Sequence, residues 1–194
     1  MFGKEYDSLI LNLKKIPGIT KKQSEKIAFY ILNLDYKELD ILINSMQELN
    51  KNLNKCSTCN FITRNVKCEI CLDANRSKRL LLVESDLDVI KLENSKIFDG
   101  KYFVFNFEDK ESIENDLILL FSIFDDFNEI IISFSPTIQG IAYTNYISSI
   151  LLKKNKNKKI SKIAYGIPIG SKIDYMDSFS IKESIENRKE IKNK

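Results

Sequence analysis

The four cysteines of this chain form two C-x2-C pairs, and this pattern constrains the fold more than any other feature. Cys56 and Cys59 make the first pair, and Cys68 and Cys71 follow after eight residues. Two residues between two thiolates let the backbone turn so that both sulfurs face one ion, and two such turns build the tetrahedral four-sulfur shell that zinc favours. Because four thiolates leave no position open for water, the pattern predicts one structural Zn²⁺ ion, whose binding energy helps a segment without its own core to fold.

Other interpretations of the cysteines remain open. The thiols could form two disulfides, one pair could be a redox C-x-x-C motif, or the shell could hold an iron–sulfur cluster. We favour zinc, because a cytoplasmic chain keeps its structural thiols reduced and because a redox motif needs only one pair.

The cysteine segment separates a helical part from a part in which strands and helices alternate. Before it, apolar residues recur at helical spacing in three segments, which begin near Tyr6, Lys21 and Asp35. After it come four short apolar runs of the kind seen in strands buried on both faces, so their alternation with helices predicts a mostly parallel sheet of about four strands. The runs are residues 80–83, 102–105, 130–132 and 160–165, with helical stretches near 86–94, 111–124 and 138–152 and a last helix that contains Ile181 and Ile185.

The composition indicates a folded chain and excludes several kinds of catalysis. With 194 residues, 43% hydrophobic and 29% charged, the chain can form one medium domain or two or three small ones around a buried core. It contains no histidine, which excludes Ser-His-Asp and Cys-His catalysis and histidine-ligated zinc hydrolysis. No apolar stretch reaches the ~20 residues of a membrane span, and the first residues do not resemble a signal peptide, so we expect a cytoplasmic protein with no membrane partner.

Positive charge is concentrated in the N-terminal part. Residues 1–79 carry 14 basic against 9 acidic residues, a net +5, whereas residues 80–194 carry 16 against 18, a net −2. A surplus of this size is often a solvated surface, but it indicates that any contacts with phosphate are to be sought in the N-terminal part. A second basic run, six lysines between positions 153 and 162, is expected to be a solvated loop that complements a helix dipole.

A Pro-Gly turn between the first two predicted helices has the form of a helix-hairpin-helix. Residues 16–20 read Ile-Pro-Gly-Ile-Thr, and Lys21, Lys22 and Lys26 follow on the next helix. A tight turn with glycine exposes backbone N–H groups beside a positive helix N-terminus, and lysines four apart share one helix face, which suits phosphate without base recognition. An ordinary helical turn with solvated lysines is the equally simple alternative, and Thr20 stands where a second glycine is usual in such hairpins.

These features occur in the same order in the bacterial recombination-repair family RecR, which the chain resembles over nearly its whole length. Residues 16–29 are similar to the family's helix-hairpin-helix, with Lys22 and Lys26 at its basic positions, and the four cysteines match its zinc motif. Residues 82–84, Leu-Val-Glu, resemble the end of the first strand of the family's Toprim domain. Further matches are residues 136–140, residues 163–170, Asp174, Tyr175, Asp177 and Arg188.

The resemblance implies an α/β protein in four parts. These are a helix-hairpin-helix region (1–54), a four-cysteine zinc finger (55–75), a Toprim domain with a mostly parallel sheet of about four strands (79–172), and a C-terminal helix and tail (173–194). It also implies a non-catalytic scaffold that binds single-stranded and duplex DNA without sequence preference and helps to load recombinase at single-stranded gaps. RecO and RecF-like proteins would be its partners, and it would assemble as a homo-oligomer, a dimer or a tetrameric ring, in the cytoplasm at the nucleoid.

The Toprim segment departs from the family at acidic positions. Gln139 and Ile141 stand where the family has glutamates, and the strand at 130–132 leads into Ser133 without a carboxylate that could complete a magnesium shell. Glu84 is present, and we expect it on an acidic surface that faces protein partners rather than at a catalytic centre. Two alternatives remain: a metal-dependent Toprim nuclease or primase-like enzyme, and a module that binds only proteins.

Overall fold

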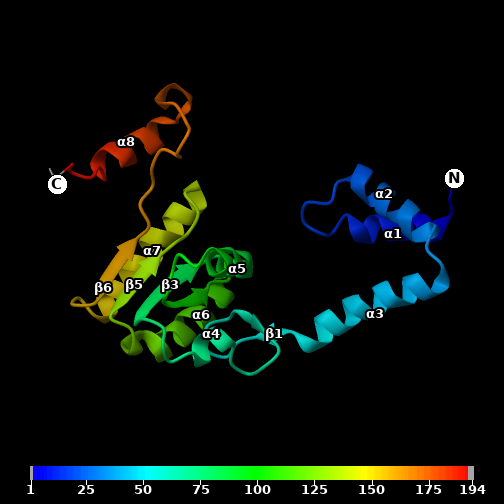
Figure 1. The fold of residues 1–194 in the computed structure, drawn as a ribbon, viewed down its shortest axis with the longest axis horizontal. Coiled ribbons are helices and arrows are strands. Elements are labelled where there is room, and N and C mark those ends of the chain that lie inside the picture. Colours follow the sequence, from blue (N-terminus) through cyan, green and yellow to red (C-terminus); the bar gives the residue numbers. More distant parts are fainter. Residues whose placement is uncertain (1, 192–194) are drawn as a thin grey trace. The chain divides into compact units, whose positions relative to one another are not determined.

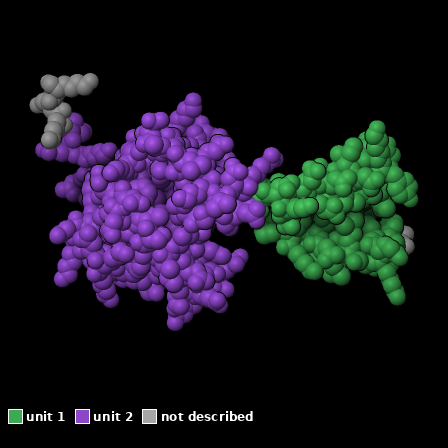
Figure 2. Space-filling model, turned by 90° about the horizontal axis from the view of Figure 1, so that it is seen from below, with its two compact units in different colours: residues 1–53 green, residues 54–194 purple. Residues whose placement is uncertain are grey.

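The chain folds into two compact units, Met1–Leu53 and Asn54–Lys194 (Figure 2). The computed structural model describes residues 2–191. Among these residues no helix combines the length and the apolar character that crossing a membrane requires.

The first unit consists of the three predicted helices (Figure 1). They are α1 (Lys4–Leu13), α2 (Lys21–Leu32) and α3 (Tyr36–Asn52). The first two pack against each other as a hairpin, and the rings of Phe2, Tyr6 and Phe29 cluster where they meet. The helical periodicity of the sequence is therefore confirmed in this unit.

Side-chain caps define where the second and third helices begin. Thr20 accepts a hydrogen bond from the N–H of Gln23, whose side chain accepts one from the N–H of Thr20 in return. Asp35 and Glu38 form the same reciprocal capping box at the start of α3. Each box satisfies two backbone donors that a helix N-terminus otherwise leaves unpaired.

The first unit buries little of its apolar surface. Only Ser24 and Ala28 are buried among its described residues, and α3 buries none. Large apolar side chains that remain exposed on these helices are Leu11, Phe29, Tyr30, Leu32, Tyr36, Ile41, Ile43, Met46 and Leu49. An apolar surface of this extent is typical of an interaction face.

The second unit opens with a small module around the cysteines. Strands β1 (Asn54–Lys55) and β2 (Ile62–Thr63) pair antiparallel, and the short helix α4 (Glu69–Leu72) follows. These elements lie in the segment where the sequence shows no periodicity, because the cysteines and not an apolar stripe determine their arrangement.

A four-stranded parallel sheet forms the body of the second unit, as predicted (Figure 1). Its strands are β3 (Arg79–Val83), β4 (Lys101–Val104), β5 (Glu129–Ile132) and β6 (Lys159–Lys162), in the spatial order β4-β3-β5-β6. Helices α5 (Asp86–Ser95), α6 (Lys110–Ile123), α7 (Ile138–Lys154) and α8 (Ser178–Glu186) complete it, with single 3₁₀ turns at Phe124–Asp126 and Ile173–Tyr175.

Strands β3 and β4 are buried on both faces, which explains their unbroken apolar runs, whereas β6 is exposed or half-buried along its length. Leu80 and Leu82 of β3 pack in the core that includes residues of α6 and α7, whereas Leu81 and Val83 pack with Val89 of α5. Since side chains alternate along a strand, a run buried on both faces must be apolar at every position.

The last strand is shorter than the sequence predicts. The expected strand at 160–165 ends at Lys162, and its final ladder bond runs from the N–H of Ile163 to the carbonyl of Ile132. At that point the neighbouring strand β5 also ends, so no partner remains for the residues beyond. The final helix likewise ends at Glu186, and the Arg188 guanidinium donates to the carbonyl of Ile185.

The basic run at 153–162 is largely engaged within the second unit. Lys154 and Lys158 donate to the carbonyls of Phe121 and Phe127, near the end of α6. Two further lysines of the run form ion pairs, Lys159 with Glu129 and Lys162 with Glu183. The bonds to carbonyls at the end of α6 agree with the expectation that the run complements a helix end, whereas the partners of these four lysines were not expected for a solvated loop.

Candidate metal centre and acidic cleft

The four cysteines converge at the start of the second unit. Cys68 caps the N-terminus of α4 and Cys71 lies within that helix, opposite the turn that carries Cys56 and Cys59. All four sulfurs lie within 4.8 Å of one another, with Sγ–Sγ distances of 3.6 Å for Cys59 and Cys68 and 3.9 Å for Cys56 and Cys71. Four sulfurs about 2.3 Å from an ion at the centre of a tetrahedron would be about 3.8 Å apart, so the group has the dimensions of a metal shell.

The donor set fits a structural metal ion. The cysteines are free, and their separations far exceed the ~2.05 Å bond of a disulfide. Cys56, Cys59 and Cys68 are at most 3% exposed, and Cys71 is half-buried. Four soft thiolates without an oxygen donor suit zinc, and their burial leaves no position for a reactive water.

Hydrogen bonds within the module prepare negative charge on sulfur. A hydrogen bond between the thiols of Cys59 and Cys68 lowers the pKa of Cys68 and raises the pKa of Cys59. Backbone N–H groups assist, from Cys71 to the Sγ of Cys68 at 3.4 Å and from Cys68 to the Sγ of Cys56 at 3.3 Å. Metal binding to such a group displaces the remaining thiol protons.

The cysteine module is attached to strand β4 by direct hydrogen bonds, two of which end on cysteines. The N–H of Val104 donates to the carbonyl of Cys59 at 2.9 Å, and the ammonium of Lys101 donates to the carbonyl of Cys71 at 2.7 Å. Both acceptors belong to cysteines of the candidate metal shell, so the sheet is bonded directly to residues of the metal centre.

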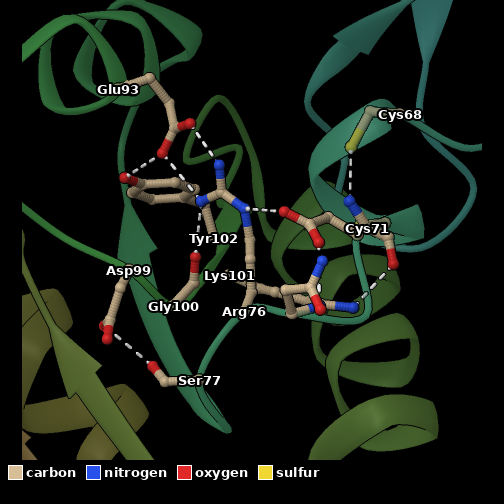
Figure 3. A network of polar contacts seen from close by, with 11 residues as sticks. Cys68, Cys71, Arg76, Ser77, Glu93, Asp99, Gly100, Lys101 and Tyr102 are labelled. Atoms are coloured by element: carbon tan, nitrogen blue, oxygen red, sulfur yellow. Dashed lines mark hydrogen bonds and ion pairs between the residues drawn. The ribbon is translucent and has the colours of Figure 1, made fainter. Parts of the chain in front are cut away.

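A charged network continues from the module into the sheet (Figure 3). Arg76 donates to Glu93 of α5, and a second bond runs to the carbonyl of Gly100 at 2.8 Å. Tyr102 of β4 donates to the same glutamate at 2.7 Å, and the Nε of Arg76 lies 3.6 Å from Asp73. The bond from Arg76 holds the pKa of Glu93 below its ordinary value, and burial together with Glu93 raises the pKa of Tyr102.

A cleft of about 800 Å³ opens at the carboxyl end of the sheet. The segments that follow β3, β4 and β5 line it, so it lies at the carboxyl ends of three parallel strands, where open α/β sheets bind ligands. Its lining residues include Lys55, Asn60, Glu84, Asp86, Asn106, Phe107, Glu108, Asp116, Ser135, Gln139, Gly140 and Tyr143. Four carboxylates against one lysine make the cleft acidic.

The carboxylates of the cleft each have their own hydrogen-bond partners within the chain. Glu84 accepts a hydrogen bond from the hydroxyl of Ser135, and Asp86 accepts from Lys55 at 3.1 Å and from the N–H of Ile62 at 2.8 Å. Asp116 is 8% exposed, and burial raises its pKa. In residues 2–191 the cysteines are the one group of His, Cys, Asp and Glu side chains gathered closely enough to hold an ion.

The lysines predicted to contact phosphate lie on one helix of the first unit. Gly18 adopts a left-handed φ of 82° in the turn, and the N–H of Ile19 closes it on the carbonyl of Ile16. Lys21 pairs weakly with Glu25 at 3.9 Å, whereas the exposed Lys22 and Lys26 have no ion-pair partner in the described part of the chain. Thr20 is the N-cap of α2. A residue that fixes the start of the helix therefore stands where a second glycine is usual in such hairpins.

The sequence identifies the cysteines, the lysines and Glu84, but not the residues that connect them to the fold. The structure brings the four cysteines together, whereas Glu84 and the lysines belong to different units. Arg76 and Asn60 are missed because their partners are distant in sequence. One signal was available for Arg76: lysine outnumbers arginine 26 to 4, so an arginine marks a position that needs a planar, multidentate donor.

Two family models match successive segments of the second unit, and full-length relatives match nearly the whole chain. A family model described as "Toprim domain" matches residues 78–164, and one described as "RecR, C-terminal" matches residues 166–189. A protein named Recombination protein RecR from Mycoplasmopsis pulmonis is 42% identical, over 94% of this chain and 97% of its own length. Proteins of the same name from Finegoldia magna and Francisella philomiragia are 32% and 31% identical, over 99% of this chain and 99% and 98% of their lengths.

Proposed function

Because the chain belongs to the RecR family of recombination proteins, we propose that it acts in recombinational repair as a non-catalytic, DNA-binding scaffold. In this role it helps to load recombinase at single-stranded gaps together with RecO- and RecF-type partners. It works in the cytoplasm, at the nucleoid, and its parts correspond to residues 1–54, 55–75, 79–172 and 173–194.

The geometry of the first hairpin is the observation that carries DNA binding. Lys22 and Lys26 are one helical turn apart, exposed and free of acidic partners among residues 2–191. They follow a glycine turn at the positive end of α2, where phosphate oxygens are stabilised. Contacts of this type recognise the backbone of single-stranded or duplex DNA and not its sequence.

The cleft supports a role in partner binding rather than in phosphoryl transfer. Magnesium-dependent enzymes hold their ion with converging carboxylates, but Glu84 is bonded to Ser135 and Gln139 adds no charge. An acidic cleft beside the stacked rings of Phe107 and Tyr143, whose centroids are 4.0 Å apart, suits a basic side chain of a partner protein.

Zinc and self-association complete the proposal. The tetracysteine group supplies a structural Zn²⁺ site through Cys56, Cys59, Cys68 and Cys71. The exposed apolar side chains of the first unit support a homo-oligomer, a dimer or a tetrameric ring, because such a surface is stabilised by a second copy.

Fluorescence anisotropy tests the DNA site directly. Labelled single-stranded and duplex DNA is titrated with wild type and with the double variant Lys22→Glu, Lys26→Glu at two salt concentrations, with magnesium present. Each lysine that neutralises a duplex phosphate contributes about 0.9 to the slope of log affinity against log salt, so the slope should fall by about 1.8 per chain. The control is Lys37→Glu, Lys91→Glu, an equal change of charge at exposed helical lysines without ion-pair partners in the described residues.

The outcomes separate the three functions. Weaker binding with a smaller salt slope in the hairpin variant, but not in the control, supports the scaffold. Unchanged DNA affinity with an altered oligomer size in the hairpin variant would instead favour a module that binds proteins. Cleavage of the DNA that disappears in Glu84→Gln would establish a metal-dependent enzyme.

A further inference from the structure

The turn formed by Cys59 and Asn60 supplies hydrogen-bond partners to backbone groups at the outer edge of the sheet. Strand β4 is an edge strand, so its outward N–H and C=O groups have no strand partner. At Val104 both groups are nevertheless bonded: the N–H donates to the carbonyl of Cys59 at 2.9 Å, and the carbonyl accepts from the Nδ2 of Asn60 at 3.1 Å.

The same Asn60 amide reaches a buried carboxylate. Its Nδ2 also donates to the Oδ1 of Asp116 on α6 at 2.6 Å, so both hydrogens of the amide are used. The Oδ2 of Asp116 accepts from the N–H of Asn106 at 2.6 Å, the residue at which the chain leaves β4 for the cleft. A chain of bonds therefore runs from Cys59 through Asn60 and Asp116 to Asn106, and its last three members line the cleft.

The backbone at Asn60 explains why asparagine suits this position. Its φ of 61° is left-handed, a conformation that asparagine and glycine tolerate better than other residues. Glycine would accept the turn equally well, but only asparagine adds the two donors. The turn is otherwise held by local bonds, such as that from the N–H of Asn60 to the carbonyl of Cys56 at 3.0 Å.

We infer that Asn60 is a positioning residue that couples metal binding at the four cysteines to the shape of the acidic cleft. A metal ion fixes Cys59, the Cys59–Asn60 turn fixes Asp116, and Asp116 holds the backbone at Asn106 that forms one wall of the cleft. The coupling rests on these bonds alone; that the cleft receives a partner rests on the proposed function.

Amide hydrogen exchange of the zinc-loaded chain, followed by NMR without DNA or partner, tests the coupling. The variant Asn60→Gly keeps the left-handed turn and removes both side-chain bonds. The matched control, Asn65→Gly, makes the same change at an exposed asparagine of the same module. Leu82 in the central strand β3 reports global stability, because its side chain is fully buried within the sheet.

The expected result is specific to one wall of the cleft. In zinc-loaded Asn60→Gly, exchange at Asn106 should rise about tenfold or more, the factor that corresponds to loss of a hydrogen bond to a charged acceptor. Chelation of zinc from wild type should produce the same rise at Asn106, and chelation of Asn60→Gly should add nothing there. Asn65→Gly should behave as wild type, and zinc content should be one per chain in all three proteins.

Three outcomes would overturn the inference. The amide of Asn106 could stay protected from exchange in wild type after zinc is removed. Chelation could instead raise exchange at Leu82 as much as at Asn106, which would mean that the metal stabilises the whole unit. Loss of zinc from Asn60→Gly would place the residue in the metal site itself. If that variant does not fold, Asp116→Ala removes the same link from the other side and should make exchange at Asn106 independent of zinc. Failure of DNA or partner binding leaves every one of these readouts unchanged.

Discussion

Gly140 provides the sharpest test of the geometry around the cleft. It is the third residue of α7 and is buried against the loop that follows β5. A Cβ at this position would lie 2.1 Å from the carbonyl oxygen of Ser135 and 3.2 Å from the Oε1 of Glu84. Because the close neighbour is backbone, the helix would have to move by at least about 0.9 Å to bring the shorter contact to 3.0 Å.

Two effects of opposite sign compete in Gly140→Ala. Inside a helix, alanine is favoured over glycine by about 1 kcal/mol, so a site with free space would gain stability. Overpacking against a backbone atom costs about 1–3 kcal/mol or more, and the required displacement places Gly140 toward the upper part of that range. We therefore expect net destabilisation of about 1–2 kcal/mol, which lowers the melting temperature by about 2–8 °C in a chain of this size.

Thermal and urea unfolding of the zinc-loaded protein measure this difference, with Gly166→Ala as the control. A Cβ on Gly166 would meet only the Oγ of Ser184 at 3.7 Å, an ordinary contact, so that variant should be as stable as wild type or slightly more stable. A Gly140→Ala protein that matches or exceeds the stability of wild type would refute the close approach of α7 to Ser135.

Two further predictions concern the charged network and the core. Since Arg76 and then Tyr102 hold the pKa of Glu93 below its ordinary value of about 4.5, Glu93 adds stability above about pH 4.5 that is lost as the pH falls through the folded-state pKa. Urea unfolding should thus show a smaller loss of stability on acidification in Glu93→Gln than in wild type, and an equal loss would contradict the bond. On α6, Leu120→Ala should lower the free energy of unfolding by about 2–5 kcal/mol, because Leu120 is fully buried. The control Ile118→Ala should change it by less than about 0.5 kcal/mol, because Ile118 is 69% exposed.

The alternation of strands and helices was predictable because it depends on local chemistry. Four apolar runs predicted four parallel strands, and the reason, that a strand covered on both faces must be apolar at consecutive positions, holds for β3 and β4 but not for the half-exposed β6. The C-x2-C spacing predicted convergence of the cysteines, since each pair is a local turn and only one long-range contact is needed. The end of the last strand was not predictable at 160–165, because it depends on where β5 ends.

The contacts that join module, sheet and cleft could not be predicted, because each links residues far apart in sequence. Asn60 and Asp116 are 56 positions apart, and Arg76 reaches Gly100 over 24. Asparagine is frequent in this chain, and the residue type alone does not distinguish Asn60 from the other 17 asparagines. Only its place directly after Cys59, in a turn that requires a left-handed residue, points to a special role.

The position of the cysteine module follows from the topology of the sheet. The chain order places the module before β3, the inner strand, yet its hydrogen bonds go to β4, the edge strand. An exposed parallel edge offers unpaired backbone groups to other chains, and natural sheets cover or interrupt such edges. Cys59, Asn60 and the helix α4 cover this one, and the buried cysteines together with Phe61 and Ile70 pack into the apolar core of the sheet. The energy of metal binding can therefore stabilise the sheet as well as the module, because the bonds at Val104 and Lys101 end on carbonyls of two of the four cysteines.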